Sequence, residues 1–392
     1  MRIDLVLLCF AYVLSQFYRA FLAVLTEVLE RDVGASPEDL ATASGFWFLA
    51  FAAMQIPVGW ALDKVGPRRT AAVLLLIGGA GGAAVFAMAT TPAHISIAMV
   101  LIGVGCSPVL MASYYIFARV YPPAVFATLA AVILGVGSVG NLASALPTTL
   151  AVEAFGWRAV VWGMAAISAV TALGLWLVVQ DPERVVHEEK GSLFDLLKMP
   201  ALWLIFPLMA FQYAPAGGAR GLWIGPYFRD IFGAGDGVVG TITLIMGAAM
   251  IAGTFAYGPL DRVFGTRKWV IFGGNVFSLI ACLWLGLVGV ESLWLAVALF
   301  AAVGFFGASF PVIMAHGRSF YPPHLVGRGV TLMNLFGIGG VGIMQMVTGR
   351  LYAGAAKGAE TPDAPYQLLF TFYGALVALG LVIYLFAQDR TD

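Results

Sequence analysis

The chain has 392 residues, of which 61% are hydrophobic and only 11% are charged, and its mean hydropathy is +0.92. A soluble domain carries roughly 25% charged residues, so the solvent of this chain is mostly lipid. The 21 basic residues equal the 21 acidic ones, and this balance gives no sign of a nucleic-acid partner. Cys9, Cys106 and Cys282 lie inside apolar segments, and we interpret them as small core residues rather than metal ligands or disulfides.

Membrane-spanning helices of about 20 mostly apolar residues are the main structural signal. The first apolar run continues past Tyr18 without a signal-peptide cleavage site, so we interpret it as a span. The same window predicts twelve spans, near residues 5–29, 40–62, 70–90, 95–118, 126–150, 158–180, 200–227, 237–260, 269–289, 293–317, 328–350 and 366–387. A long polar connector divides the chain into an N-terminal six-helix bundle (1–180), a cytoplasmic linker (181–199) and a C-terminal six-helix bundle (200–392).

The placement of lysine and arginine predicts the orientation, because cytoplasmic loops are enriched in both. With the N-terminus inside, 14 of the 21 basic residues fall on the cytoplasmic side and 5 on the outer side. The remaining two, Arg19 and Arg220, fall within spans. We therefore expect a multi-pass protein of the bacterial inner membrane with both termini in the cytoplasm.

The two halves repeat. Three landmarks recur in order at an offset near 200, each after the equivalent span: Arg31-Asp32 and Arg229-Asp230, Leu62–Val65 and Leu260–Val263, and Tyr121–Pro123 and Tyr321–Pro323. This recurrence predicts parallel repeats related by an axis along the membrane normal.

The loop after the second span combines glycines with an acid and several bases: Gly59, Leu62, Asp63, Lys64, Gly66, Arg68 and Arg69. A degenerate copy follows the eighth span: Gly258, Asp261, Arg262, Gly265, Arg267 and Lys268. An aspartate at a helix end can face the positive N-terminus of a neighbouring helix, while the bases hold that side of the membrane inside.

This motif resembles the loop signature of the major facilitator superfamily, and the resemblance covers essentially the whole chain. It implies an all-α membrane fold of two six-helix bundles related by pseudo-two-fold symmetry, and secondary transport by alternating access. In that superfamily such loops help to close the cytoplasmic face. The resemblance therefore implies a gating role for Gly59, Asp63, Lys64, Gly66, Arg68, Arg69, Asp261 and Arg262.

Arg19 and Arg220 are costly inside a membrane. An arginine near the bilayer centre costs about 2.5–3.5 kcal/mol on insertion scales, so it usually faces protein, a partner or a water-filled cavity. Aligning the Arg-Asp landmarks places Gly217 opposite Arg19, with Arg220 three residues further outward on nearly the same helix face. A guanidinium binds carboxylates and phosphates in bidentate geometry. We therefore expect a positively charged site on the axis between the halves and a small organic anion as substrate.

Paired arginines on the first and seventh helices resemble those of the organophosphate–phosphate exchangers. The stretch from Tyr18-Arg19 through Gln55, Pro57 and Gly59 resembles the anion–cation symporters of the same superfamily. The alternatives are an ion pair of Arg19 with Glu27, and an Arg220 that extends outward toward the membrane surface.

Other polar or aromatic side chains in the spans are further candidates for binding the substrate: Tyr18, Tyr114, Tyr115, Tyr213, Trp223, Asn141 and Asn334. Aromatic packing is the alternative for the rings, and helix–helix hydrogen bonding is the alternative for these amides and for Gln345. The pair Gly217-Gly218 after Pro215 predicts either a break in the seventh helix or close packing against it.

Energy coupling is less clearly encoded. The chain has no G-x-x-x-x-G-K-[ST] phosphate loop, so we do not expect ATP use. Glu27 and His316 are the candidate proton carriers. The alternatives are a structural pair or surface position for Glu27, and a helix-end role beside Arg318 for His316. Anion exchange and proton symport both remain open, and we expect a monomer without a cofactor or metal.

Two other functions compete with the anion carrier. A proton-driven exporter of neutral or cationic compounds is the first, although the span-four arginine of many such exporters is replaced here by Met99. A membrane sensor that binds a ligand without moving it is the second. Because no hydrolytic or redox site is evident, we do not expect an enzyme.

Overall fold

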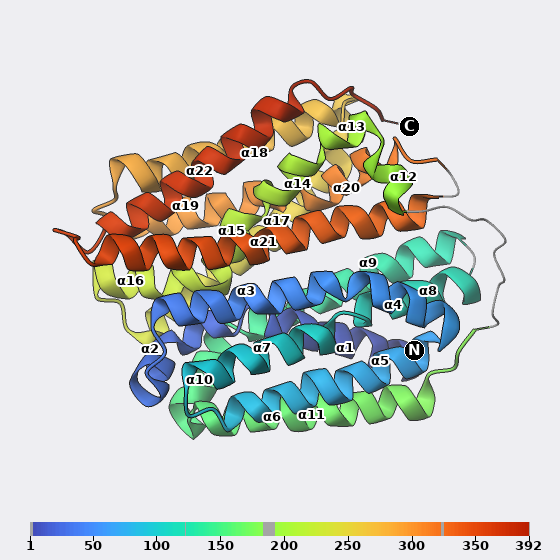
Figure 1. Ribbon diagram of the computed structural model, residues 1–392, viewed down its shortest axis with the longest axis horizontal. Coiled ribbons are helices and arrows are strands. Elements are labelled where there is room, and N and C mark those ends of the chain that lie inside the picture. The colour runs from blue at the N-terminus through green and yellow to red at the C-terminus, as the bar shows by residue number, and fades with distance from the viewer. Residues whose placement is uncertain (1–2, 122, 183–192, 323–324, 392) are drawn as a thin grey trace. The chain divides into compact units, whose positions relative to one another are not determined.

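The computed structural model describes residues 3–121, 123–182, 193–322 and 325–391, which form helices and no strand (Figure 1). They divide into two compact units, Met1–His187 and Glu188–Asp392. Most of the predicted linker, residues 183–192, lies outside the described ranges. The described end of that linker forms the short helix α12, Leu193–Leu197.

Unit 1 is a bundle of apolar helices. Its elements are α1 (Ile3–Tyr18), α2 (Leu22–Val33), α3 (Pro37–Ala53), α4 (Gln55–Lys64), α5 (Pro67–Leu74), the π-helix η1 (Leu75–Ala80), α6 (Gly81–Ala87), α7 (Pro92–Cys106), α8 (Val109–Val120), α9 (Pro123–Ala143), α10 (Leu146–Phe155) and α11 (Trp157–Val178). Prolines at the first helical position begin four of them, where a missing N–H costs nothing: Pro37, Pro67, Pro92 and Pro123.

Unit 2 has the same kind of bundle. After α12 it contains α13 (Pro200–Trp203), α14 (Phe206–Gln212), α15 (Ala214–Gly218), η2 (a π-helix, Ala219–Trp223), α16 (Ile224–Phe232), α17 (Asp236–Phe264), α18 (Lys268–Leu283), η3 (a π-helix, Trp284–Val288), α19 (Leu293–Phe306), η4 (a 3₁₀ turn, Gly307–Ser309), α20 (Phe310–Arg318), α21 (Val326–Ala356) and α22 (Ala364–Tyr384).

The helices account for most of the predicted spans. Within the described ranges, nine are long and apolar enough to cross a membrane, or eleven if each of two bent pairs is one span. The bent pairs are α1 with α2, at 51°, and the described part of α9 with α10, at 44°. The seventh predicted span, 200–227, is the run of short helices from α13 to α16, which reaches Phe232. The first span is also longer than predicted and ends at Val33.

The repeat seen in the sequence is also present in the packing. In unit 1, α3 packs along α7 and α1 along α9; in unit 2, the equivalent helices α17 and α19, and α14 and α21, pack in the same pairs. Glycines allow the helices of two equivalent pairs, α1 with α9 and α14 with α21, to approach each other closely. A Cβ on Gly140 would lie 2.0 Å from the carbonyl oxygen of Val13, and a Cβ on Gly340 would lie 2.3 Å from that of Ala210. The two glycines are 200 positions apart.

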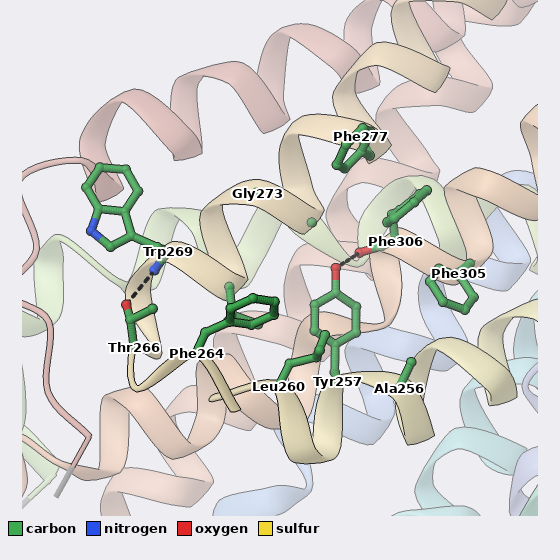
Figure 2. Close-up of a pocket in the computed structure, with 12 residues that line it drawn as sticks. Ala256, Tyr257, Leu260, Phe264, Thr266, Trp269, Gly273, Phe277, Phe305 and Phe306 are labelled. Carbon is green, nitrogen blue, oxygen red and sulfur yellow. Dashed lines mark hydrogen bonds between the residues drawn. The ribbon is translucent and has the colours of Figure 1, made fainter. Parts of the chain in front are cut away.

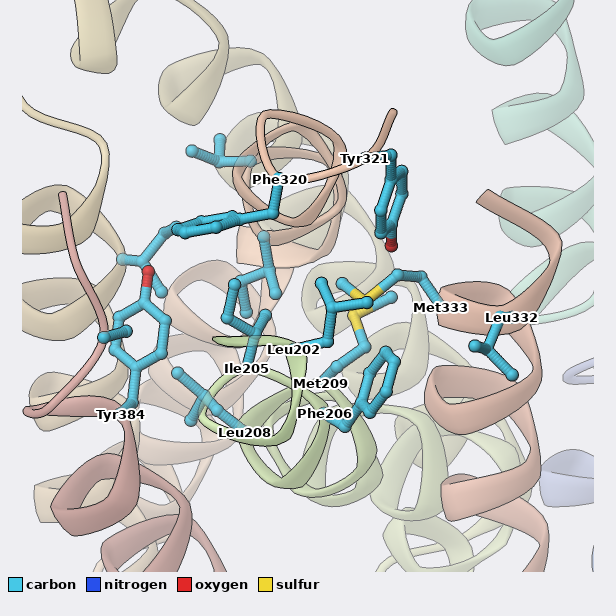
Figure 3. Packing of buried hydrophobic residues seen from close by; sticks show 14 of the residues in the cluster. Leu202, Ile205, Phe206, Leu208, Met209, Phe320, Tyr321, Leu332, Met333 and Tyr384 are labelled. Carbon is cyan, nitrogen blue, oxygen red and sulfur yellow. The ribbon is translucent and has the colours of Figure 1, made fainter. Parts of the chain in front are cut away.

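Each unit has its own apolar core. The unit 1 core runs through α1, α4, α5, α8, α9 and α11 and includes Cys9; all three cysteines are buried and free, as predicted. The unit 2 core gathers around α14, where Leu208 and Met209 are buried among residues of α13, α20, α21 and α22 (Figure 3). The rings of Phe206 and Phe336 stack there with centroids 4.3 Å apart.

The glycine crossings generate a stability prediction. Gly140→Ala and Gly340→Ala each place a Cβ against the backbone of the neighbouring helix. Backbone atoms cannot move aside as a side chain can, so the two helices must separate. We expect each to lower the free energy of unfolding by about 1–3 kcal/mol in detergent, measured by thermal unfolding. Gly135→Ala, on the same helix as Gly140 but with nothing within 4 Å of its Cβ, is the matched control and should be neutral. Equal melting temperatures for Gly140→Ala and Gly135→Ala would contradict the close crossing.

Candidate functional site

Arg19 lies at the break in the first span. α1 ends at Tyr18, the next three residues form turns, and α2 begins at Leu22. The backbone N–H groups of Ala20 and Phe21 both donate to the carbonyl oxygen of Phe17, at 3.1 Å. This tight turn produces the 51° bend. The predicted cation therefore occupies irregular backbone inside a span, which is where many transporters build their sites.

The guanidinium of Arg19 faces the aromatic side chains of α3. Its Cζ lies 5.5 Å from the ring centroid of Trp47 and 5.7 Å from that of Phe51, and these two rings stack on each other. Its Nε is buried and has no hydrogen-bond partner. Within the described ranges, no carboxylate lies within the 4.0 Å ion-pair distance of this side chain. Glu27, its predicted alternative partner, lies on α2 with an exposed side chain.

The other unit 1 candidates lie elsewhere in the bundle. Tyr18 is buried toward α11, where its hydroxyl is 3.0 Å from the Ser168 hydroxyl. The ring centroid of Tyr115 lies 3.4 Å from the Arg119 Cζ at the basic end of α8. Tyr114 packs against the apolar core. Asn141 lies just before the bend between α9 and α10, where its carbonyl accepts from Ser144. Tyr18 therefore contacts α11 and Tyr115 contacts Arg119, whereas Arg19 faces α3.

Arg220 also lies in irregular backbone. It is the second residue of the π-helical turn η2 and is only 3% exposed. A Cβ on Gly247 of α17 would lie 3.0 Å from its Nε, so the absence of a side chain there makes room for the guanidinium. The preceding glycines serve packing. A Cβ on Gly218 would lie 2.1 Å from the hydroxyl of Tyr373 in α22.

The remaining unit 2 candidates mostly contact neighbouring helices. The buried indole N–H of Trp223 donates to the Thr348 hydroxyl of α21, at 3.1 Å. Tyr213 lies between α14 and α15, with its ring edge-on to Phe310 of α20. Asn334 lies half-buried on the same helix as Thr348.

At the basic end of unit 1, a carboxylate caps the third span. Asp181 follows α11 and accepts the backbone N–H of Arg68, at 2.8 Å, in the first turn of α5. Its other oxygen lies 3.7 Å from the Arg68 Nε. Gly66 makes room for it, because a Cβ there would lie 2.8 Å from the carboxylate and the residue has φ +105°. The loop motif in the sequence contains Gly66 and Arg68 but not Asp181, which lies at the start of the predicted linker.

The other residues of the loop motif lie at the same end of unit 1. Asp63 forms an ion pair with Arg119 of α8, at 3.8 Å. Lys64 and Arg69 are exposed, and Gly59 lies on α4 with open space around it.

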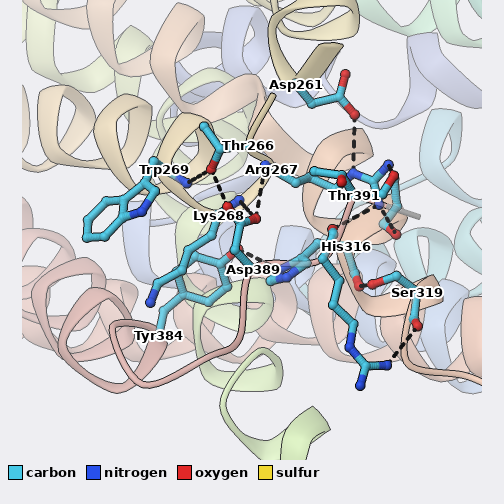
Figure 4. Close-up of polar contacts among 12 residues, drawn as sticks. Asp261, Thr266, Arg267, Lys268, Trp269, His316, Ser319, Tyr384, Asp389 and Thr391 are labelled. Atoms are coloured by element: carbon cyan, nitrogen blue, oxygen red, sulfur yellow. Dashed lines mark hydrogen bonds and ion pairs between the residues drawn. The ribbon is translucent and has the colours of Figure 1, made fainter. Parts of the chain in front are cut away.

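Unit 2 repeats the cap (Figure 4). Asp389, after α22, accepts the backbone N–H groups of Arg267 and Lys268, at 3.1 and 2.9 Å, and the hydroxyl of Thr266. Arg267 also donates to Asp261 at 3.2 Å, while Arg262 is exposed. Burial disfavours the charged form of Asp389. The hydrogen bonds nevertheless hold its pKa below the ordinary value of 3.8.

His316 belongs to the same network. Its Nε2 lies 2.9 Å from the carbonyl oxygen of Gln388, which can only accept, so Nε2 carries the proton. Its Nδ1 lies 2.6 Å from the Tyr384 hydroxyl. Both ring nitrogens therefore tie α20 to the end of α22 and the residues after it. This arrangement agrees with the helix-end alternative for His316.

A second pair of equivalent contacts lies at the other end of each unit, where the first and seventh spans finish. Asp32 accepts the indole N–H of Trp157, at 2.9 Å, and so links the first span to the start of the sixth. Asp230 accepts the hydroxyl of Tyr366 and links the seventh span to the start of the twelfth. Each aspartate of the Arg-Asp landmark therefore has a structural role, and Arg31 lies exposed beside it in unit 1.

A groove of about 490 Å³ lies among α17, α18 and α19 (Figure 2). Aromatic rings and glycines form most of its lining, and none of its lining residues is charged. Its buried tyrosine, Tyr257, donates to the carbonyl oxygen of Phe306. The groove therefore offers no cation to an anionic ligand and is distinct from the surroundings of Arg19 and Arg220.

The cap on α18 generates a prediction with a pH dependence. Asp389→Asn should lower the free energy of unfolding by roughly 0.5–2 kcal/mol, as loss of a helix cap does. Asp195→Asn, which removes an exposed partner of Lys198, should change it by less than about 0.5 kcal/mol. Because the pKa of Asp389 is lowered by folding, its contribution is complete above pH 3.8 and is lost as the pH falls through the lowered pKa. Thermal unfolding in detergent across this range checks it; a deficit in the Asn variant that persists at the acid end would contradict it.

A protein-family model described as Major Facilitator Superfamily matches residues 8–222 and 216–392. No curated protein matches the chain. Among solved structures, a bacterial homolog of the human lysosomal transporter Spinster has a TM-score of 0.75 at 16% identity, covering 98% of this chain and 96% of its own. The nucleoside transporter NupG has 0.77 at 15%, covering 98% and 99%. A D-xylose–proton symporter has 0.76 at 14%, covering 98% and 97%.

At these identities the solved structures show a shared fold. The family model matches nearly the whole chain and both of its units. The chain therefore belongs to the Major Facilitator Superfamily, whose members are secondary transporters rather than enzymes.

Proposed function

We propose that this transporter carries a small organic anion, a carboxylate or a phosphate ester, and that Arg19 binds the anion's negative charge. The observation that supports this most is the state of the Arg19 side chain. It sits at the break of a span, has a buried Nε without an acceptor, and has no carboxylate partner within the described ranges. A permanent cation kept in this state makes sense if its counter-charge is a ligand.

The positive charge of Arg19 is costly to bury. Guanidinium groups stay charged in proteins, so Arg19 cannot avoid its desolvation cost by losing a proton. The rings of Trp47 and Phe51 stabilise it by cation–π contact, roughly 0.5–2 kcal/mol each. An anion adds charge-assisted hydrogen bonds of about 1.5–3 kcal/mol each. The Arg19 guanidinium without a ligand therefore favours the binding of an anion over that of a cation.

Arg220 remains a second candidate for anion binding, although it is more deeply buried than Arg19 and is not without a partner. We further propose that the loop motifs gate the cytoplasmic side. The Asp63–Arg119 and Asp261–Arg267 pairs and the helix caps on α5 and α18 would loosen and re-form during alternating access.

Proton symport and anion exchange both fit this proposal. Glu27 remains the proton-carrier candidate, while the two hydrogen bonds of His316 support a structural role. We place the protein in the bacterial inner membrane as a monomer with both termini in the cytoplasm, as the distribution of basic residues predicts. The solved structures named above include nucleoside and xylose transporters, but a likeness at 14–15% identity does not extend to the substrate.

Thermal stabilisation of the purified protein by a panel of carboxylates, sulfonates and phosphate esters tests the proposal. A ligand at 100 times its dissociation constant adds about 2.7 kcal/mol and raises the melting temperature. We expect at least one anion to stabilise the wild type, and Arg19→Gln to weaken its binding about 10- to 100-fold because charge-assisted hydrogen bonds are lost. Arg19→Lys should recover only part of the affinity, since an ammonium lacks the planar fork.

Arg31→Gln is the matched control, since Arg31 lies on the same span but is exposed beside Asp32. It should bind the anion like the wild type. Stabilisation by neutral or cationic compounds alone, equal in wild type and Arg19→Gln, would overturn the anion proposal and favour an exporter of such compounds.

A further inference from the structure

Trp47 has an unused hydrogen-bond donor beside Arg19. The side chain is 1% exposed, and its indole Nε1 is buried with no hydrogen-bond partner in the described part of the chain. A buried N–H without an acceptor is unusual in a native protein, because the group has lost water and gained nothing in return. Trp223, another buried tryptophan of this chain, shows the usual arrangement: its indole N–H donates to the Thr348 hydroxyl at 3.1 Å.

The two unpaired donors belong to side chains in cation–π contact. The Arg19 Cζ lies 5.5 Å from the Trp47 ring centroid, and the Nε of Arg19 and the Nε1 of Trp47 are both buried without acceptors. The two oxygens of a carboxylate can each accept an N–H at about 2.9 Å, so one carboxylate can accept from donors on two neighbouring side chains. Two buried donors without acceptors on neighbouring side chains indicate a ligand that supplies acceptors.

We propose that Trp47 is a substrate-binding residue that shares one carboxylate with Arg19, and that the transported anion is a monocarboxylate with an apolar body. This inference rests on the proposed function. It adds Trp47 to the candidate substrate-binding residues, and it narrows the class of substrate from organic anions in general to monocarboxylates.

The charge around the two donors supports a single negative charge. Between Asp4 and Lys64 the only basic residues are Arg19 and Arg31, and Arg31 lies at the exposed end of α2 beside Asp32. A phosphate monoester or a dicarboxylate brings about two negative charges, which Arg19 alone does not balance. Two further aromatic rings, Phe48 and Phe51, lie against the Trp47 ring. These rings suit an apolar ligand body and offer nothing to a second carboxylate.

The test compares probes that share one body and differ in the head group. Benzoate, phthalate, phenyl phosphate and neutral benzamide form one set; butyrate, succinate, propyl phosphate and butyramide form an aliphatic set. We expect the monocarboxylate of at least one set to bind the wild type at least tenfold more tightly than its three relatives, measured by thermal shift and by calorimetry in detergent. Equal or tighter binding of the dianions would overturn the proposed substrate class.

Trp47→Phe keeps an aromatic ring over Arg19 but removes the N–H. It should weaken the monocarboxylate roughly 10- to 100-fold, as loss of a hydrogen bond to a charged group does, and leave benzamide binding unchanged. Trp60→Phe, at a 63% exposed tryptophan of α4, is the control and should bind like the wild type. The melting temperatures without ligand show whether either variant has lost its fold.

The indole N–H provides a second readout that does not depend on the variant's stability. In the ¹⁵N-labelled wild type, the indole resonance absent from Trp47→Phe should move downfield on titration with the monocarboxylate. A resonance that does not move, together with unchanged affinity in Trp47→Phe, would overturn the role of Trp47. If Arg19→Gln still loses binding, the proposed function survives that result. If Arg19→Gln binds normally, the proposed function fails first.

Discussion

A permanent positive charge inside a membrane-spanning segment constrains everything around it. Arg19 cannot be neutralised by losing its proton, and the described chain offers it aromatic faces but no carboxylate. Its backbone is also irregular, because the first span bends at this residue. A cation without a carboxylate partner and an irregular backbone are both costly in a lipid-solvated bundle. A charged ligand that arrives and leaves gives all of them one explanation, and a carrier is the kind of protein that needs such a ligand.

The rest of each unit is built to hold this irregular region in a rigid frame. The same helix pairs pack in both units, with glycines at equivalent crossings, Gly140 in one and Gly340 in the other. At one end, Asp181 and Asp389 cap the third and ninth spans. At the other end, the aspartates after the first and seventh spans bind side chains at the start of the sixth and twelfth. The duplicated halves have therefore kept the contacts that fix the helix ends. They differ more in the middle, where Arg19 and Arg220 lie in a turn and a π-helix respectively.

The fold could be predicted because its signals can be read from the sequence without any tertiary contact. These signals are the long apolar runs, the landmarks that recur about 200 residues apart, and the charged loop motif. The details of the site could not. The residues around the break at Arg19 include neither glycine nor proline, so nothing in the chain marks it. The capping role of Asp181 depends on a contact with Arg68, 113 residues away. Tyr18 and Trp223 were plausible ligands by position, and only the structure shows that Ser168 and Thr348 lie within hydrogen-bonding distance of them.

Uptake into proteoliposomes tests the central claim most directly, because it asks whether an anion is moved and whether Arg19 is needed. Vesicles containing wild type, Arg19→Gln or Arg31→Gln are loaded with whichever unlabelled monocarboxylate, benzoate or butyrate, binds the wild type more tightly, and are diluted into the same radiolabelled compound at constant pH. We predict rapid, saturable counterflow for the wild type and Arg31→Gln, and none above empty vesicles for Arg19→Gln. Saturable counterflow of equal rate in all three proteins would contradict a role for Arg19 in binding the transported anion.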